Sequence, residues 1–472
     1  MVFSSNIFLF LFLPVFLAVY YSLPFRFRSA WILLGSYALY SWWRLDFLWL
    51  LIAVTAAAYL FALQIAGAEG KRRFRLLTVS VVLNLLALGY FKYANFGIES
   101  FNAAITAVGF QPFSWAPVLL PIGLSFFIFH AISYLVDVYR EEEPPTHNPL
   151  DFAAFIALFP HLIAGPVLKY NLLAGQFRSR THTLEKFSYG ATRFMTGFAK
   201  KVLIADTIAP LVTAAFAQQS PTLSDSWLGA LAYTLQLYFD FSGYSDMAIG
   251  LAAMMGFKFP ENFNHPYISR SITEFWRRWH MSLSSWLREY LYIGLGGNRK
   301  GRTRTYVNLA LTMVLGGLWH GANFTFILWG TWHGGILVIE RLLKEATLWK
   351  PSPAWLTIPG TLLLVMLGWV MFRADNVTDA FRMYRGMFGF NGLGLSDTLA
   401  WQVRGSELAT LLLASVLIYV APWWGARVGE VGGTLRRPRA ATLATLTLLP
   451  LFVLAILKLS AQSYTPFLYF QF

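Results

Sequence analysis

Long apolar stretches separated by short polar loops run through the whole chain. The first lies between Ile7 and Tyr21, and others are expected at about residues 30–44, 46–66, 76–95 and 117–137. A helix needs about 20 apolar residues to cross the hydrocarbon core of a bilayer. Counted on that length, the pattern predicts roughly eleven membrane-spanning helices. We therefore expect an all-α polytopic membrane protein in which residues 1–472 form a single integral-membrane domain.

Composition agrees with this pattern, because 57% of the residues are hydrophobic and only 13% are charged. No Lys or Arg precedes the first apolar stretch and no small-residue cleavage pattern follows it, so it is predicted to be a spanning helix and not a signal peptide. Cysteine is absent. A covalent acyl relay would therefore use oxygen or nitrogen, and we expect no thiol-based metal site and no metal.

Charge sets the expected orientation. The net charge is +14, but the basic residues form short clusters between the apolar stretches, which does not favour nucleic-acid binding. The first two clusters are at residues 26–28 and 71–75, and the expected spans place both on the same side. Because Lys and Arg accumulate in cytoplasmic loops, that side is expected to be the cytoplasm and the N-terminus to lie outside. The last span, about residues 441–460, follows basic residues 436–439, so the aromatic tail at 461–472 is expected outside.

Three stretches place polar groups where a membrane protein seldom tolerates them. The first, "LYFDFSGYSDMAIG", contains Asp240 and Asp246. Six residues separate them, about 240° around a helix, so they do not share a proton as a dyad. Either they hold helices together, through hydrogen bonds or ion pairs with Arg, or they take part in catalysis.

The second stretch, "SITEFWRRWHMSLSSWLREYLY", has helical apolar spacing with an Arg-rich opposite face. It is too polar to span and is expected to lie in the interface or to dip into the membrane and return. Glu274 can pair with Arg277 or Arg278. His280 shares the predicted buried face with Trp276, and it is interpreted as a structural or an active-site histidine.

The third stretch, "VLGGLWHGANFTFILWGTWHGG", carries His320 and His333, each in a Trp-His-Gly triplet. Glycines beside His320 would let a helix or a thin substrate chain approach closely. His333 follows by 13 residues, about 220° further round if the helix is continuous, so helix geometry alone does not bring both rings to one cavity. Spacing does not choose between the two histidines.

These stretches, together with "MVFSSNIFLFLFLP", "LPIGLSFFIFHAISYLVDVYR" and "FPHLIAGPV", resemble the membrane-bound O-acyltransferases. The likeness is to the bacterial branch that contains the alginate O-acetylation and teichoic-acid D-alanylation membrane proteins. It covers most of residues 1–340, whereas residues 351–439 match loosely.

The resemblance implies a ring of helices around a central funnel, with residues 271–335 as the catalytic core segment. His320 matches the invariant family histidine, and His280 matches the second active-site position. Supporting roles then fall to a further set of residues in these stretches: His333, Trp319, Asn323, Asp240, Asp246 and Glu274.

The implied donor in this branch is cytoplasmic acetyl-CoA, whose acetyl group must cross the bacterial inner membrane without the CoA. Basic residues on the cytoplasmic side would attract the CoA phosphates, or they serve only as topology signals: Arg277, Arg278, Arg299, Lys300, Arg302 and Arg304. Expected partners are membrane lipid, a periplasmic SGNH-type O-acetyltransferase or an acetyl-carrier protein, and indirectly a polysaccharide. Alginate is the expected acceptor, with cellulose and peptidoglycan as alternatives. A non-enzymatic acyl transporter or scaffold is the competing class.

The chain finishes on "SYTPFLYFQF". This tail resembles the aromatic C-terminal motif of the small partner protein in D-alanylation systems. By that likeness Tyr469 would carry the acyl group, because a phenolic ester stays activated and a histidine can deprotonate the phenol. The alternative is an aromatic belt that anchors the last helix at the interface.

Overall fold

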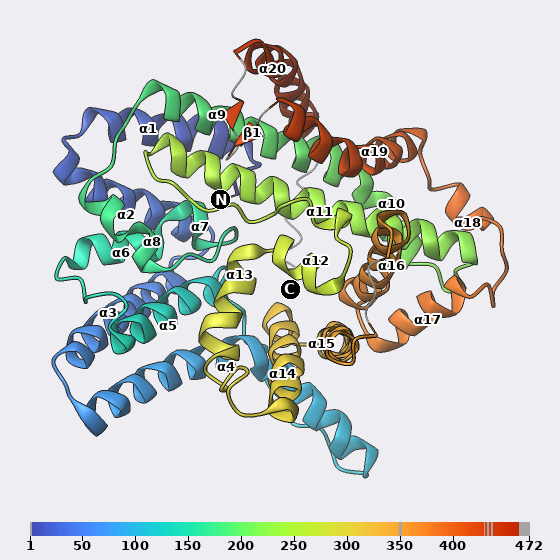
Figure 1. Cartoon of the computed structure of the whole chain (residues 1–472), viewed down its shortest axis with the longest axis horizontal. Coiled ribbons are helices and arrows are strands. Elements are labelled where there is room, and N and C mark those ends of the chain that lie inside the picture. The colour runs from blue at the N-terminus through green and yellow to red at the C-terminus, as the bar shows by residue number, and fades with distance from the viewer. Residues whose placement is uncertain (1, 349–351, 429, 432–433, 436–437, 462–472) are drawn as a thin grey trace. The chain divides into compact units, whose positions relative to one another are not determined.

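A computed structural model describes residues 2–348, 352–428, 430–431, 434–435 and 438–461. The chain divides into two compact units, one formed by Met1–Leu184 with Met255–Lys258 and the other by Glu185–Met254 with Phe259–Phe472. Each unit is described by itself. Figure 1 traces the elements in chain order from blue to red.

The first unit is helical among its described residues. Its elements are η1 (Phe8–Phe12), α1 (Leu13–Ser22), α2 (Phe25–Ser41), α3 (Asp46–Ala66), α4 (Gly70–Ala107), α5 (Leu124–Arg140), α6 (Pro149–Ala157), α7 (Phe159–Leu162) and α8 (Tyr170–Arg178). The predicted helix at 117–137 begins later, at Leu124. Two prolines, Pro117 and Pro121, precede it, and proline lacks the backbone N–H that a helix interior needs.

The second unit holds the three polar stretches. Its helices are α9 (Leu184–Ala199), η2 (Lys200–Ala205), α10 (Asp206–Phe216), α11 (Leu223–Met254), η3 (Pro266–Ile268), α12 (Ile272–Arg278), α13 (Met281–Trp286), η4 (Leu287–Tyr292), α14 (Arg302–His320), α15 (Phe324–Glu345), α16 (Ala354–Arg373), α17 (Val377–Met387), α18 (Asp397–Ala400), α19 (Gly405–Val428) and α20 (Pro438–Ala461). Two-residue strands, β1 (Glu430–Val431) and β2 (Thr434–Leu435), pair antiparallel between the last two helices.

Within the described part of the chain, four helices are long and apolar enough to cross a membrane: Asp46–Ala66, Gly70–Ala107, Ala354–Arg373 and Gly405–Trp423. Two shorter apolar helices, Phe8–Ser22 and Leu446–Ala461, match the first and last predicted spans. The membrane character and the all-helical class are therefore confirmed. The count of roughly eleven spans stays a prediction.

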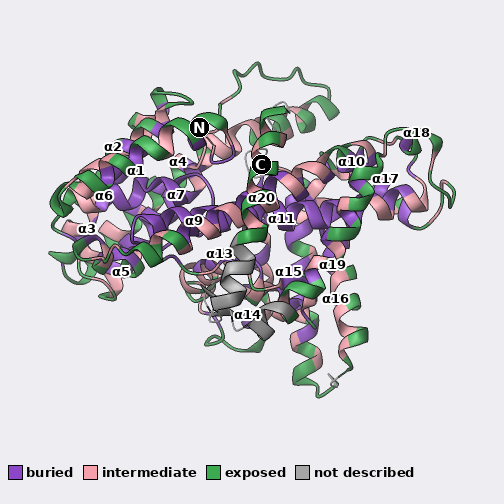
Figure 2. Ribbon diagram, turned by 90° about the horizontal axis from the view of Figure 1, so that it is seen from above, coloured by how far each residue is buried: buried purple, intermediate pink, exposed green. Residues whose placement is uncertain are grey.

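Helix α11 is the buried axis of the second unit, and every residue from Ala232 to Met254 is buried (Figure 2). It crosses α9 at two glycine pairs, Gly190 with Gly250 and Gly197 with Gly243. A Cβ added at Gly190 would lie 2.6 Å from the carbonyl oxygen of Gly250, and the reverse substitution gives 2.5 Å. Only glycine permits backbones to approach this closely, so the two pairs fix the register of α9 on α11.

Candidate active site

His320 is the last residue of α14, and the chain turns back immediately after it. Gly321 is extended, and Asn323 caps α15 by accepting a hydrogen bond from the backbone N–H of Thr325 at 3.0 Å. Helices α14 and α15 therefore form a hairpin, not the continuous helix on which the 220° estimate depended. The Asn cap after a glycine supplies the physical reason for the break.

The glycines around His320 serve this hairpin. A Cβ at Gly317 would collide with the backbone carbonyl of Phe326, and one at Gly321 would collide with the Phe326 ring. Gly330 is packed in the same way against the carbonyl of Met313. Of the two expected occupants of this space, a helix or a thin substrate chain, the structure places a helix there.

His280 lies in a tight turn and not on the face of one amphipathic helix, so the predicted face shared with Trp276 is wrong. The stretch divides into α12, α13 and η4, and His280 adopts the left-handed conformation with φ +43° between the first two. None of the three pieces is long enough to cross a bilayer, as expected for a segment that does not span. His280 is nevertheless buried, with 1% of its surface exposed.

Three histidines gather around shared tryptophan rings. Trp319 contacts both His320, at 4.9 Å between ring centroids, and His280, at 6.3 Å. Trp329 contacts His320 at 5.3 Å and His333 at 5.1 Å. The hairpin thus brings together the histidines that continuous-helix geometry had separated.

The environments of these histidines differ. Burial lowers the pKa of His280 to about 3, so its imidazole is neutral at physiological pH. His333 is fully buried, and neither of its ring nitrogens has a hydrogen-bond partner among the described residues. His320 keeps 7% of its surface exposed and also packs against Phe372, at 5.1 Å between centroids.

The carboxylates of α11 form ion pairs with α9 and η2. Asp246 accepts from Arg193 at 2.7 Å and from Lys200 at 2.7 Å, and Asp240 lies 2.7 Å from the ammonium of Lys201. In the structure the two aspartates thus hold helices together, which is one of the two interpretations offered by the sequence. Their ion-pair partners include lysine as well as arginine. Glu274 pairs with Arg278 at 2.8 Å, one of the two partners expected for it.

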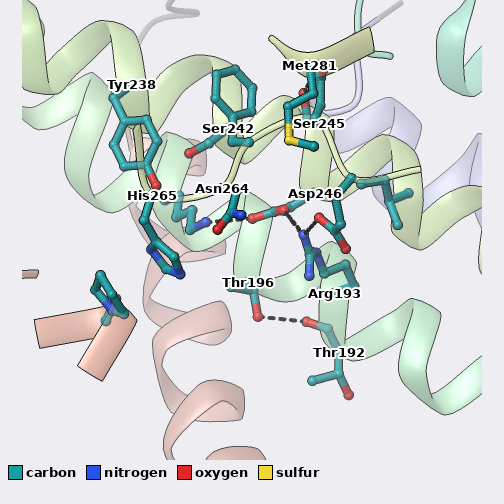
Figure 3. Close-up of a pocket in the computed structure, with 17 residues that line it drawn as sticks. Thr192, Arg193, Thr196, Tyr238, Ser242, Ser245, Asp246, Asn264, His265 and Met281 are labelled. Atoms are coloured by element: carbon teal, nitrogen blue, oxygen red, sulfur yellow. Dashed lines mark hydrogen bonds and ion pairs between the residues drawn. The ribbon is translucent and has the colours of Figure 1, made fainter. Parts of the chain in front are cut away.

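A pocket of about 690 Å³ opens beside these ion pairs (Figure 3). Arg193, Lys200, Asp246 and Glu261 line it, and the two cations are bonded to the two carboxylates. Its wall also includes Met281, the residue that follows His280. Because its charges compensate one another, the pocket suits an uncharged polar chain better than a phosphate group.

The basic residues proposed for donor binding are exposed or partly exposed. Arg278 and Arg302 are engaged by carboxylates, the latter with Glu345 at 2.6 Å. The remaining four form no ion pair within the described part of the chain: Arg277, Arg299, Lys300 and Arg304. These four retain uncompensated charge for an anionic ligand. No group of three or more His, Cys, Asp or Glu that could hold a metal occurs among the described residues.

Sequence reasoning missed several polar residues that shape the site. Glu340 accepts hydrogen bonds from the backbone N–H groups of Ile272, at 2.6 Å, and Thr273, at 3.0 Å, and so caps α12 from α15. Asn262 binds the turn that carries His280. Their hydrogen-bond partners lie 68 and 20 residues away in the sequence, so a local sequence pattern does not reveal these contacts. The basic partners of Asp240 and Asp246 in α9 and η2 were missed as well: Arg193, Lys200 and Lys201.

The aromatic tail, including Tyr469, lies outside the described residues. The tail's role therefore stays a prediction.

Comparison with known proteins identifies the class to which this fold and this histidine cluster belong. The chain belongs to the membrane-bound O-acyltransferase family, whose model matches residues 32–374. It is an acyltransferase of the membrane.

Within that class, the chain is similar along its whole length to the "Probable alginate O-acetylase AlgI" of Azotobacter vinelandii, at 55% identity over 100% of both chains. A peptidoglycan O-acetyltransferase of Helicobacter pylori is 36% identical over 84% of this chain and 81% of its own length. A teichoic acid D-alanyltransferase of Bacillus subtilis is 27% identical over 65% of this chain and 84% of its own.

Proposed function

We propose that this protein transfers the acetyl group of cytoplasmic acetyl-CoA across the inner membrane to a periplasmic partner, which O-acetylates an exopolysaccharide, alginate. The observation that carries the proposal is the shared contact of His320 and His280 with Trp319 in a chain that resembles alginate O-acetylases end to end. A peptidoglycan acceptor is the second candidate, on the strength of the Helicobacter relative.

The proposed architecture is one acyltransferase domain over residues 1–472, in which a ring of roughly eleven spanning helices surrounds a funnel. Residues 271–335 form its core, with the N-terminus and the tail on the periplasmic side. The four uncompensated basic residues attract the CoA phosphates, while the charge-compensated pocket beside Met281 receives the uncharged part of the donor. His333, Trp319 and Asn323 support the two catalytic histidines.

In the proposed chemistry, His320 removes the proton from the Tyr469 hydroxyl, and the phenolate oxygen attacks the thioester carbonyl. The carbon–sulfur bond breaks, and the CoA thiolate takes the proton from the His320 imidazolium. A hydroxyl of the periplasmic partner then attacks the tyrosyl ester, with His280 as the second proton-transfer group, and the phenol is regenerated. General-base assistance of this kind contributes typically about 10² to 10⁴ in rate.

The experiment that tests the proposal is peptide mass spectrometry of the purified protein after incubation with acetyl-CoA. We expect the mass of one acetyl group on the C-terminal peptide, absent in Tyr469→Phe and in His320→Ala. Turnover of acetyl-CoA with no such adduct, and normal behaviour of Tyr469→Phe, would reduce the tail to an anchor. If polysaccharide acetylation continues unchanged in the His320→Ala variant, the enzymatic role of His320 is overturned.

A further inference from the structure

The turn that holds His280 is stabilised from outside its own helices. A left-handed backbone is unfavourable for a residue with a side chain, and such residues persist only where surrounding contacts determine them. Here the contacts come from the segment between α11 and η3. The backbone carbonyl of Asn262 accepts from Met281 N–H at 2.9 Å, and the backbone N–H of Asn264 donates to the carbonyl of Arg278 at 2.9 Å.

The side chain of Asn262 adds a second layer to this support. It is buried, with 1% of its surface exposed, and it spans from the pocket wall to the His280 turn. Its amide nitrogen donates to Ser245 of α11 at 3.1 Å. Its oxygen accepts from the hydroxyl of Ser282 at 2.8 Å and from the backbone N–H of the same residue at 3.3 Å.

These bonds have a consequence for the imidazole. Ser282 Oγ lies 3.5 Å from Nδ1 of His280. Since the serine hydroxyl gives its only proton to Asn262, its oxygen can act toward His280 only as an acceptor. A hydrogen bond between these two atoms therefore runs from Nδ1–H to Oγ, and in that tautomer the lone pair is on Nε2. An imidazole fixed in this way presents a proton acceptor and not a donor to the reaction.

We propose that Asn262 is the positioning residue of the site: through Ser282 it fixes the tautomer and the direction of the His280 ring. The proposal rests on the proposed function, in which His280 takes part in proton transfer. Asn262 itself touches no reacting atom. Its place in the pocket wall means that the group that orients the histidine also borders the space assigned to the donor.

The test measures acetyl-CoA turnover by release of free thiol from the detergent-purified protein, with kcat and KM determined separately. We expect Asn262→Ala and Ser282→Ala each to lower kcat by about 10- to 100-fold, because a misplaced catalytic group costs up to about 10² in rate. KM should change less than twofold. The double variant should be no slower than either single variant, since both break one chain of hydrogen bonds.

Ser285→Ala is the matched control. Ser285 lies on the same helix, α13, and its hydroxyl bonds a backbone carbonyl, that of Ser282, at 3.0 Å. Its loss should leave kcat and KM unchanged. Should Asn262→Ala not fold, Asn262→Asp replaces it, because it keeps the oxygen that accepts from Ser282. A carboxylate there favours the protonated imidazole, so the acidic limb of the pH–rate profile should move to higher pH.

Equal activity of Asn262→Ala, Ser282→Ala and Ser285→Ala would overturn the proposal, as would a change confined to KM or a double variant with multiplied losses. An unmoved pH profile in Asn262→Asp would count against it in the same way. A failure of the proposed function itself would give other results: His280→Ala would keep wild-type turnover, or the wild-type protein would release no thiol from acetyl-CoA.

Discussion

The two compact units each bury a cluster of histidines, and the clusters are built differently. In the first unit His130 and His161 stack at 4.4 Å between ring centroids, and both are tied to backbone. His161 Nε2 bonds the carbonyl oxygen of Phe155 at 2.8 Å, and the backbone N–H of Leu168 reaches His130 Nε2 at 3.4 Å. In the second unit His280, His320 and His333 lie among tryptophan and phenylalanine rings.

The difference teaches how to separate structural from functional histidines in an apolar protein. A ring nitrogen that bonds a backbone group replaces a hydrogen bond the fold needs, so that histidine stabilises the structure. A ring that contacts mainly aromatic faces contributes packing that phenylalanine would supply equally well. His280 and His320 are the members of the second cluster to which the proposed function gives a chemical role.

Of the four histidine substitutions, His320→Ala should cause the largest loss of acetyl-CoA turnover. We expect turnover of acetyl-CoA to fall by about 10² to 10⁴, the usual contribution of a general base. The midpoint of thermal unfolding in detergent is measured beside turnover, so that a loss of folded protein is separated from a loss of chemistry. Turnover within threefold of wild type would place His320 with the structural histidines.

His280→Ala should have the next largest effect on turnover, about 10- to 100-fold. Because burial lowers the pKa of His280 to about 3, its imidazole stays neutral between pH 5 and 8. The loss should therefore be the same at both ends of that range. A loss that appears only at pH 8 would show that the ring is already protonated at pH 5, contrary to its burial.

His161→Phe should lower the stability of the protein and leave its turnover nearly unchanged. It leaves the carbonyl of Phe155 without this donor, which costs about 1–3 kcal/mol for a buried group. The midpoint of thermal unfolding should fall by a few degrees, while the turnover of the protein that remains folded should stay near wild type. A large loss of kcat with an unchanged midpoint would mean that the first cluster also takes part in the reaction.

His333→Phe should give the smallest effect. The ring is enclosed by Trp276 at 5.2 Å and Trp329 at 5.1 Å, and α16 brings Gly368 against it. Replacing a buried polar ring by an apolar one of similar shape is often neutral or stabilising. We expect an unchanged or slightly higher unfolding midpoint and turnover within about threefold of wild type. A tenfold loss would assign His333 a part in proton transfer.

Much of the helical framework could be predicted from sequence, because apolar stretches of the right length have few alternatives in a membrane. The span at Asp46–Ala66 agrees with the prediction residue for residue. The hairpin after His320 carried a local signal as well, a glycine followed by an Asn that caps the next helix.

The turn at His280 carried no such signal. Its left-handed residue is a histidine and not a glycine, and the groups that hold it there are Asn262 and the neighbouring segment. A pattern of side chains along one stretch does not reveal contacts from another. For the same reason the sequence showed that Asp240 and Asp246 were unusual but did not name Lys201, Arg193 and Lys200 as their partners.

The glycine pairs between α9 and α11 have a consequence for how this protein can move. Each backbone lies in a notch of the other at two levels, about two helical turns apart, so neither helix can slide or roll without a steric clash. The two helices must travel as one rigid rod. Any movement within the second unit therefore has to be absorbed outside this pair of helices.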